Sequence, residues 1–251
     1  PIVYLIKEPI AFHILTLAAL LYGLWLFIRS RFWKNTLAKA TNWLKAHFTE
    51  FAMLAFIAFY WLVSIKGSLN IGVRHLLPVF PFTMILVAAA AVKLLKEPYL
   101  KIKFLILAAL VLWQAFSVAA VYPHFLAYFN EFVGGPDQGY KYVVDSNLDW
   151  GQDLKRLKKW TDEKGIDKIY VDYFGGGSPE RTLGEKFMPW WGTRPPEELP
   201  KGSYLAISGT FLQGGRGKAI PGLEPAGYYL WLDKYEPIAK IGYSIFVYRV
   251  D

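Results

Sequence analysis

Four long apolar runs determine what the first half of this chain can fold into. They cover residues 10–28, 51–65, 76–92 and 104–121. Each approaches the roughly 17–25 residues that a helix needs to span a bilayer, and the second run is the shortest. No comparable run follows Tyr122. The sequence therefore predicts a membrane α-helical bundle of about four spanning helices over residues 1–122, followed by a water-soluble domain.

The basic residues are concentrated in the apolar half. Up to Tyr122 the chain has 12 Lys and Arg against 3 Asp and Glu, whereas the remainder has 16 against 17. The net charge of +8 therefore belongs to the apolar half and not to a basic soluble face. We expect no nucleic-acid partner, because nucleic-acid binding needs such a face.

The loops between the apolar runs differ in charge. Nine basic residues lie between the first and second or the third and fourth runs, and three lie on the opposite side. The nine are Arg29, Arg31, Lys34, Lys39, Lys45, Lys93, Lys96, Lys101 and Lys103, and the three are Lys7, Lys66 and Arg74. The positive-inside rule then predicts a multi-pass protein of the cell (inner) membrane with its C-terminal domain outside the cytoplasm. The chain starts at Pro1 without a signal-peptide pattern, and we interpret it as the C-terminal part of a longer membrane protein.

The pattern after the last apolar run predicts a small α/β domain. Residues 123–137 are aromatic on one side and polar on the other, which favours an interfacial helix and a linker. Residues 138–251 then alternate strand-like and helix-like segments, and we expect them to form the extracytoplasmic α/β domain. The expected strands are residues 140–144, 168–174, 203–208, 239–243 and 245–250, with a helix over residues 150–164. The first two strands and this helix predict a parallel unit with a right-handed crossover.

The densest polar motif is the expected strand-to-helix turn before that helix. It contains Asp145, Asn147, Asp149, Trp150, Gln152 and Asp153. Asp149 or Asn147 is expected to cap the helix, with Gln152 or Asp153 near its first amides. Ligand binding is the alternative, because open α/β sheets bind ligands beyond their strands' carboxyl ends. A calcium loop fits poorly, since Trp150 and Arg156 stand where Gly and a bidentate acid are needed.

A second motif begins the third apolar run, in Asn70-Ile-Gly-Val-Arg74-His75-Leu-Leu-Pro78-Val-Phe-Pro81. The two prolines remove backbone donors and are expected to bend the chain at the start of the helix. Arg74 and His75 add positive charge at the depth of lipid phosphates. The motif therefore predicts a pocket for an anionic headgroup, and the alternative is that Arg74 only snorkels to bulk phospholipid.

Three further segments have two interpretations each. Gly175-Gly-Gly-Ser178-Pro179 could cradle a phosphate, or Ser178 could cap a short helix with Pro179 as its first residue. Trp190-Trp191 could stack on a sugar ring or anchor the domain on lipid, and residues 214–217 form a glycine-rich loop. The chain contains no Cys, so neither disulfides nor thiolate metal sites are available.

Taken together, several of these segments resemble a known family. Lys7-Glu-Pro9, Arg74-His75-Leu-Leu-Pro78-Val-Phe-Pro81, and the stretch from Tyr128-Phe-Asn-Glu131 through Gly134-Gly-Pro136 to Asp145-Ser-Asn-Leu-Asp-Trp-Gly-Gln-Asp153-Leu are similar to the C-terminal part of bacterial GT-C glycosyltransferases. These enzymes are related to dolichyl-phosphate-mannose protein mannosyltransferases. The similarity is most specific over residues 128–154 and weakens over residues 175–191.

The resemblance implies transfer of a sugar from a polyprenyl-phosphate carrier to an extracytoplasmic glycan or protein acceptor. It places Arg74, His75 and Lys7 where the family would hold the carrier phosphate. The family's catalytic carboxylates lie in an earlier external loop, so no residue of this chain is assigned as a catalytic base. No cofactor is expected; the sequence is compatible with a divalent metal, but no pattern in it indicates one. The alternative function is a non-catalytic, membrane-anchored module whose outer domain binds carbohydrate or protein.

We predict that the C-terminus lies outside the cytoplasm. Reporter fusions after Asp251 and within residues 29–47 test this, with periplasmic reporter activity expected only at Asp251. A cytoplasmic reporter that is active after Asp251 would contradict the topology.

Overall fold

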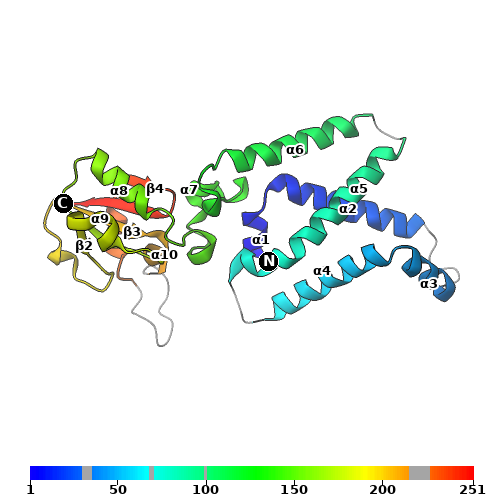
Figure 1. The fold of residues 1–251 in the computed structure, drawn as a ribbon, viewed down its shortest axis with the longest axis horizontal. Coiled ribbons are helices and arrows are strands. Elements are labelled where there is room, and N and C mark those ends of the chain that lie inside the picture. The colour runs from blue at the N-terminus through cyan, green and yellow to red at the C-terminus, as the bar shows by residue number, and fades with distance from the viewer. Residues whose placement is uncertain (30–35, 68–70, 99–100, 215–226) are drawn as a thin grey trace. The chain divides into compact units, whose positions relative to one another are not determined.

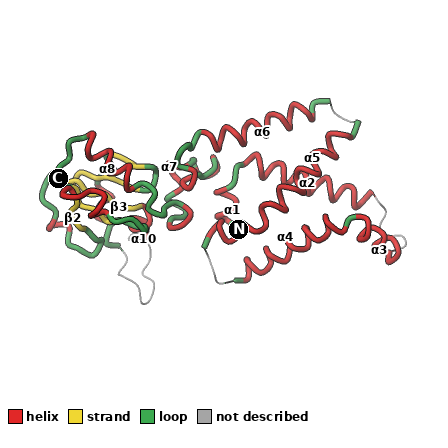
Figure 2. Tube along the Cα trace, viewed as in Figure 1, coloured by secondary structure: helices red, strands yellow, loops and turns green. Residues whose placement is uncertain are grey.

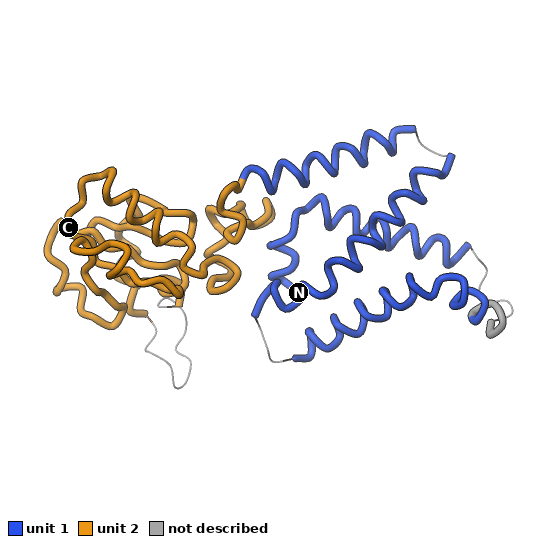
Figure 3. The backbone as a smooth tube through the Cα atoms, viewed as in Figure 1, with its two compact units in different colours: residues 1–120 blue, residues 121–251 orange. Residues whose placement is uncertain are grey.

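The computed structural model of the chain describes residues 1–29, 36–67, 71–98, 101–214 and 227–251. They form two compact units, Pro1–Ala120 and Val121–Asp251 (Figures 1 and 3). The first unit is helical, and the second combines a β-sheet with short helices (Figure 2).

The apolar runs of the first unit fold as helices. The elements are α1 (Ile2–Lys7), α2 (Ile10–Arg29), α3 (Thr36–Ala46), α4 (Phe48–Lys66), the 3₁₀ helix η1 (Gly72–Val79), α5 (Phe80–Lys96) and α6 (Lys103–Ala119). Among the described helices, α2, α4 and the continuous η1–α5 segment are long and apolar enough to cross a membrane. The fourth expected span corresponds to α6, a shorter apolar helix of 17 residues.

The helices of the first unit pack side by side. Helix α2 contacts both α5 and α6, and α5 also contacts α4. Where α2 and α5 begin, the buried side chains of Phe12, Leu76, Val79 and Phe80 form an apolar cluster. Tyr4 from α1 and Tyr60 from α4 pack against it, so this cluster joins α1, α2, α4, η1 and α5 at one end of the unit.

The segment that precedes the sheet differs from expectation. In place of one interfacial helix and a strand over residues 140–144, it contains η2 (Phe125–Ala127), η3 (Glu131–Val133), α7 (Pro136–Gly139) and turns, and no strand forms at 140–144. Asn130 caps η3 by accepting a hydrogen bond from the Phe132 amide at 3.1 Å, and Gly134 has a φ of +80°, which ends this turn. The ring of Tyr140 packs 4.5 Å from that of Phe246, so tertiary packing overrides the local strand preference.

A five-stranded mixed sheet forms the centre of the second unit, in the order β2-β1-β3-β5-β4. Strand β1 (Ile169–Asp172) pairs in parallel with β2 (Phe187–Pro189) and β3 (Ser203–Ser208). Strand β5 (Ile245–Val250) pairs antiparallel with β3 and with β4 (Ala239–Ile241). The strands expected over 203–208 and 245–250 are confirmed with those bounds. The expected crossover unit is wrong, because its first strand does not form.

The remaining elements of the second unit are short. They are η4 (Asp145–Asn147), α8 (Leu154–Glu163), α9 (Pro179–Leu183), η5 (Gly184–Lys186), η6 (Pro196–Glu198), α10 (Gly209–Gly214) and η7 (Leu230–Lys234). Helix α8 starts four residues later than expected. Ser178 caps α9 by accepting a hydrogen bond from the Arg181 amide at 3.2 Å, and Pro179 is its first residue. The capping interpretation of this segment is therefore confirmed.

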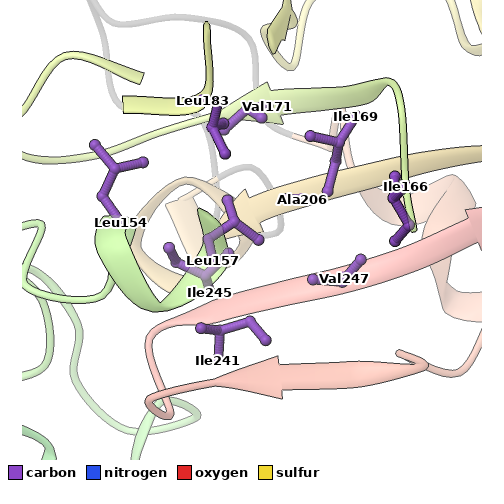
Figure 4. Packing of buried hydrophobic residues seen from close by; sticks show 10 residues of the cluster. All are labelled: Leu154, Leu157, Ile166, Ile169, Val171, Leu183, Ala206, Ile241, Ile245 and Val247. Carbon is purple, nitrogen blue, oxygen red and sulfur yellow. The ribbon is translucent and has the colours of Figure 1, made fainter. Parts of the chain in front are cut away.

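Each face of the sheet has its own apolar core. Because side chains alternate along a strand, Ala206 and Val247 face one side while Leu205 and Phe246 face the other. The first core includes Leu157 of α8, whose apolar face covers the sheet (Figure 4). The second core is more aromatic and contains the fully buried Tyr229.

We predict that Leu157→Ala destabilises the second unit. Leu157 is fully buried, and such truncations cost about 2–5 kcal/mol because they lose apolar contacts and leave a cavity. Hydrogen exchange of the β5 amides in the detergent-solubilised chain measures the loss. The matched control is Lys159→Ala on the exposed face of α8, which should leave exchange unchanged. Equal protection in Leu157→Ala and the native chain would contradict the described core.

Candidate functional site

The helical unit gathers positive charge at the end where α1 meets η1. Lys7 is the last residue of α1, and Arg74 and His75 lie in η1. Helix α1 contacts η1, and the apolar cluster that contains Phe12 and Leu76 holds both elements at this end of the unit. The structure thus brings the elements that carry these three residues together, although 66 or more positions separate Lys7 from the other two in the sequence.

The backbone around His75 is fixed by α4. The Tyr60 hydroxyl donates a hydrogen bond to the His75 carbonyl oxygen at 2.9 Å, and the two rings lie 5.7 Å apart. Pro78 lies inside η1, and the α-helical geometry of α5 starts only at Phe80. The expected irregularity before the helix is therefore observed as a 3₁₀ segment. The Arg74 side chain is exposed there, while Asn70 of the same motif lies outside the described residues.

Burial changes the pKa values of Lys7 and Glu8 more than the attraction between the two side chains does. Burial lowers the pKa of Lys7 to about 7, and the neighbouring Glu8 carboxylate opposes this shift. Burial likewise raises the pKa of Glu8 to about 7, against the attraction of Lys7. An anion bound at this end would favour the protonated ammonium of Lys7, because an opposite charge stabilises the charged form.

In the second unit, the segment from Asp145 to Asp153 forms an irregular turn closed by its own side chains. The Trp150 amide donates to Gln152 Oε1 at 2.8 Å, and Gln152 Nε2 donates to the Leu148 carbonyl at 3.0 Å. Asp145 has a φ of +54°, a left-handed conformation that Asp tolerates better than most residues. Asn147 is buried and lies in η4. Trp150 is about half exposed, at 52%.

Asp149 does not cap a helix, which corrects the prediction made for it and for Asn147. The N-cap residue of α8 is Asp153, and its side chain makes no capping hydrogen bond. Asp149 Oδ1 instead accepts a hydrogen bond from the Gly151 amide at 2.8 Å, within the turn. Helix α8 begins only at Leu154, so the carboxylate of Asp149 bonds the backbone of the turn and not the first amides of the helix.

Asp149 is completely buried and incompletely paired. Its Oδ2 atom accepts no hydrogen bond from any residue that the structure describes, although the Ser208 and Ser244 hydroxyls lie close enough to influence its ionisation. Burial raises the pKa of Asp149 to about 6; the Gly151 amide opposes the shift, and the nearby Asp153 carboxylate adds to it. An uncompensated buried carboxylate is costly and marks a site worth testing.

Asp153 joins three parts of the second unit. Its Oδ1 lies 2.6 Å from Arg156 Nη1 and 3.7 Å from His124 Nδ1, and its Oδ2 accepts a hydrogen bond from Ser244 Oγ at 2.7 Å. Gly242, with a φ of +60°, passes so close that a Cβ atom there would collide with the carboxylate. His124 and Ser244 could not be predicted as partners of Asp153 from the sequence, because they are far from it in the chain and belong to no local motif.

The turn lies at the carboxyl edge of the parallel strands. Strand β1 leads toward β2 on one side, while β3 leads into α10 and the other side of the sheet, so the chain directions diverge between β1 and β3. The Phe174 amide donates to Ser208 Oγ at 2.9 Å, and the Tyr173 hydroxyl donates to the Gly151 carbonyl at 2.9 Å. Ligands of open α/β sheets bind at such a divergence. The turn reaches this edge through tertiary contacts and not through a preceding strand.

The two tryptophans of the Trp190-Trp191 pair have different environments. Trp190 is buried, and Trp191 is 51% exposed. The Arg194 guanidinium lies over both rings, at 4.7 Å and 4.8 Å from their centroids, and also pairs with Glu198 at 2.5 Å. A cleft of about 340 Å³ lies beside Arg194 and Tyr228. The glycine-rich loop predicted at residues 214–217 lies, except for Gly214, outside the described residues.

Among the described residues there is no group of three or more His, Cys, Asp or Glu side chains arranged to hold a metal ion. Comparison of the chain with protein-family models, with curated proteins and with solved structures gives no match.

We predict that Asp149 makes the second unit less stable as the pH rises. Because its folded pKa is raised from 3.8 to about 6, the folded state holds the proton more tightly, and the stability gained below about pH 4 is lost as the pH rises through 6. This loss amounts to about 3 kcal/mol at most. Asp149→Asn should therefore raise β5 amide protection at pH 7 and change it little at pH 4.

The matched control is Asp167→Asn, which alters an exposed carboxylate of the same unit. Hydrogen exchange of the native chain, Asp149→Asn and Asp167→Asn is measured at pH 4 and at pH 7 and compared. If Asp149→Asn lowered protection at pH 7, the ionised carboxylate would be stabilised in the fold and the raised pKa would be wrong.

Proposed function

We propose that this chain is part of a membrane glycosyltransferase that moves a sugar from a polyprenyl-phosphate carrier to an extracytoplasmic glycan or protein acceptor. The observation that carries the proposal is the meeting of α1 and η1, the elements of Lys7, Arg74 and His75, at one end of a unit of apolar helices. The resemblance of these segments to GT-C glycosyltransferases points to the same chemistry.

The end of an apolar helical unit suits a lipid-linked phosphate. In a bilayer, an isoprenoid chain lies against apolar helices, while its phosphate stays at the interface with polar groups. Arg74 is exposed there and offers a planar fork of donors that matches phosphate oxygens in pairs. Lys7, with its pKa of about 7, gains a full positive charge when an anion binds beside it. We propose that these two side chains bind the carrier phosphate and that His75 supports them.

The cations would act on the leaving group. During transfer, a bond forms between the acceptor oxygen and the sugar's anomeric carbon, and the bond from that carbon to the phosphate oxygen breaks. The acceptor's proton passes to a base, for which no residue of this chain is proposed, and the bonding electrons leave with the phosphate. Arg74 and Lys7 would stabilise the negative charge that develops on the departing phosphate, which is where such groups accelerate a reaction.

A second candidate function rests on the Trp191 surface of the second unit. An exposed indole beside Arg194 and a cleft of about 340 Å³ is the kind of surface on which sugar rings stack. A membrane-anchored carbohydrate-binding module would need this surface and would not need Arg74. The two candidates therefore differ in which substitution removes binding.

We predict that the chain, reconstituted in nanodiscs, binds a polyprenyl phosphate more tightly than the matching polyprenol. Arg74→Ala should weaken binding about tenfold or more, because charge-assisted hydrogen bonds contribute about 1.5–3 kcal/mol. The affinity of Arg74→Lys should lie between those of the native chain and Arg74→Ala, since an ammonium point charge replaces the planar guanidinium. Lys93→Ala, which removes one exposed cation from the last turn of α5, is the matched control and should bind normally.

Equal binding of the phosphate and the polyprenol, or unchanged binding in Arg74→Ala, would leave only contact with bulk lipid. Transfer is measured with membranes from the cells that make this protein, as label passing from a polyprenyl-phosphoryl sugar to acceptor. Loss of transfer in Arg74→Ala with normal transfer in Trp191→Ala supports the enzyme. Transfer that is unchanged in both variants, together with loss of carbohydrate binding in Trp191→Ala, supports the binding module.

A further inference from the structure

The helical unit contains a long apolar groove away from the Arg74 end. It has a volume of about 520 Å³ and is lined by residues of α2, α5 and α6. Helix α2 contacts both neighbours, whereas α5 and α6 contact each other little among the described residues, so α2 forms the floor and the other two helices form the walls. Ala18 and Ala19 on α2 and Ala90 and Ala91 on α5 leave the space open.

The groove is long and mostly apolar. Its lining on α2 runs from Leu15 to Trp25, which is about 15 Å along a helix axis. A space of about 520 Å³ with mostly apolar walls of this length suits an extended acyl chain.

One end of the groove is polar. Glu97 and Lys103 line it there, and the Tyr22 hydroxyl donates a hydrogen bond to Glu97 Oε1 at 3.2 Å. Lys103 Nζ donates to the backbone carbonyl of Leu94 at 3.1 Å and also to that of Glu97. Glu97 is the one acidic residue among those that line the groove, whereas the adjoining helix ends carry Arg29, Lys96 and Lys101 as further exposed cations.

Aromatic side chains mark the same end. The rings of Tyr22 and Trp25 stack at 5.9 Å, and the Arg29 guanidinium lies 5.0 Å from the Trp25 ring centroid. Tyr and Trp are enriched at the level of lipid headgroups. The groove thus combines an apolar channel, an aromatic belt and a cationic mouth, which is the arrangement in which basic pockets between membrane helices bind anionic lipid headgroups.

We propose that this groove is a binding site for an anionic glycerophospholipid, with one acyl chain between α5 and α6 and the phosphate at the mouth beside Lys103. The positive charge at the mouth selects an anionic headgroup over a zwitterionic one. This site lies at the opposite end of α2 and α5 from Lys7 and Arg74 and does not depend on the proposed glycosyltransferase function.

Native mass spectrometry of the chain released from mild detergent tests the proposal. The probes are phosphatidylglycerol and phosphatidylcholine with identical acyl chains. We expect one retained phosphatidylglycerol and at least about fivefold weaker retention of phosphatidylcholine. Ala91→Leu fills the channel and should weaken phosphatidylglycerol binding about fivefold or more, while Ala88→Leu, on the exposed side of the same helix, should not.

Lys103→Gln tests whether the charge of Lys103 binds the lipid phosphate at the polar end of the groove. Lys66→Gln, at the other end of the unit, is its control. Lys103→Gln should weaken phosphatidylglycerol binding and leave phosphatidylcholine binding unchanged. Because Lys103 also bonds the last turn of α5, its variant could fail to fold, and the Ala91→Leu comparison then decides alone. Equal retention of both lipids, or full retention of phosphatidylglycerol in Ala91→Leu, would overturn the proposal.

Discussion

The cost of placing charge in an apolar helix governs the arrangement of the first 120 residues. Charged side chains at the centre of a bilayer are expensive, so they are confined to the ends of helices that cross it. Lys7 accordingly occurs where α1 ends and just before α2 begins, and Arg74 lies in η1, just before α5 begins. Arg29, Lys96 and Lys103 occur where α2 and α5 end and α6 begins. Each end thereby becomes a cationic surface beside apolar helices. The two proposed lipid sites follow from this one constraint, and they differ in which lipid phosphate each end would bind.

The second unit, in contrast, buries carboxylates within its fold, among them those of Asp149 and Asp153. Asp153 is compensated by Arg156 and Ser244, so its burial links α8 to the β4–β5 hairpin. Asp149 Oδ1 accepts a hydrogen bond from the Gly151 amide, whereas its Oδ2 meets no donor with hydrogen-bond geometry among the described residues, so burial of the ionised carboxylate is costly. The exposed Trp150 lies in the same turn, beside the carboxyl edge of β1 and β3. A costly buried group at the carboxyl edge of parallel strands, where open α/β sheets commonly bind ligands, motivates the hypothesis that this turn has a functional role.

Local patterns predicted the elements whose periodicity is long or uninterrupted. The apolar runs and the strands at 203–208 and 245–250 were predictable because burial there follows chain-local rules. The Ser178-Pro179 cap was predictable because its residues act on their immediate neighbours. Tyr140 was misleading, since its ring packs on Phe246, more than a hundred residues later. The surroundings of Asp149 and Asp153 were equally hidden, because Ser208 and Ser244 reach them only through the order of the strands.

The end of the helical unit formed by α1 and η1 is the proposed binding site for a polyprenyl phosphate. Photo-crosslinking with a polyprenyl phosphate that carries a photoreactive group next to the phosphate, followed by peptide mapping, tests this most directly. We expect the label to fall on residues 1–9 or on η1, and we expect excess unlabelled polyprenyl phosphate, but not polyprenol, to prevent this labelling. Labelling confined to the groove of α2, α5 and α6 or to the second unit would contradict it.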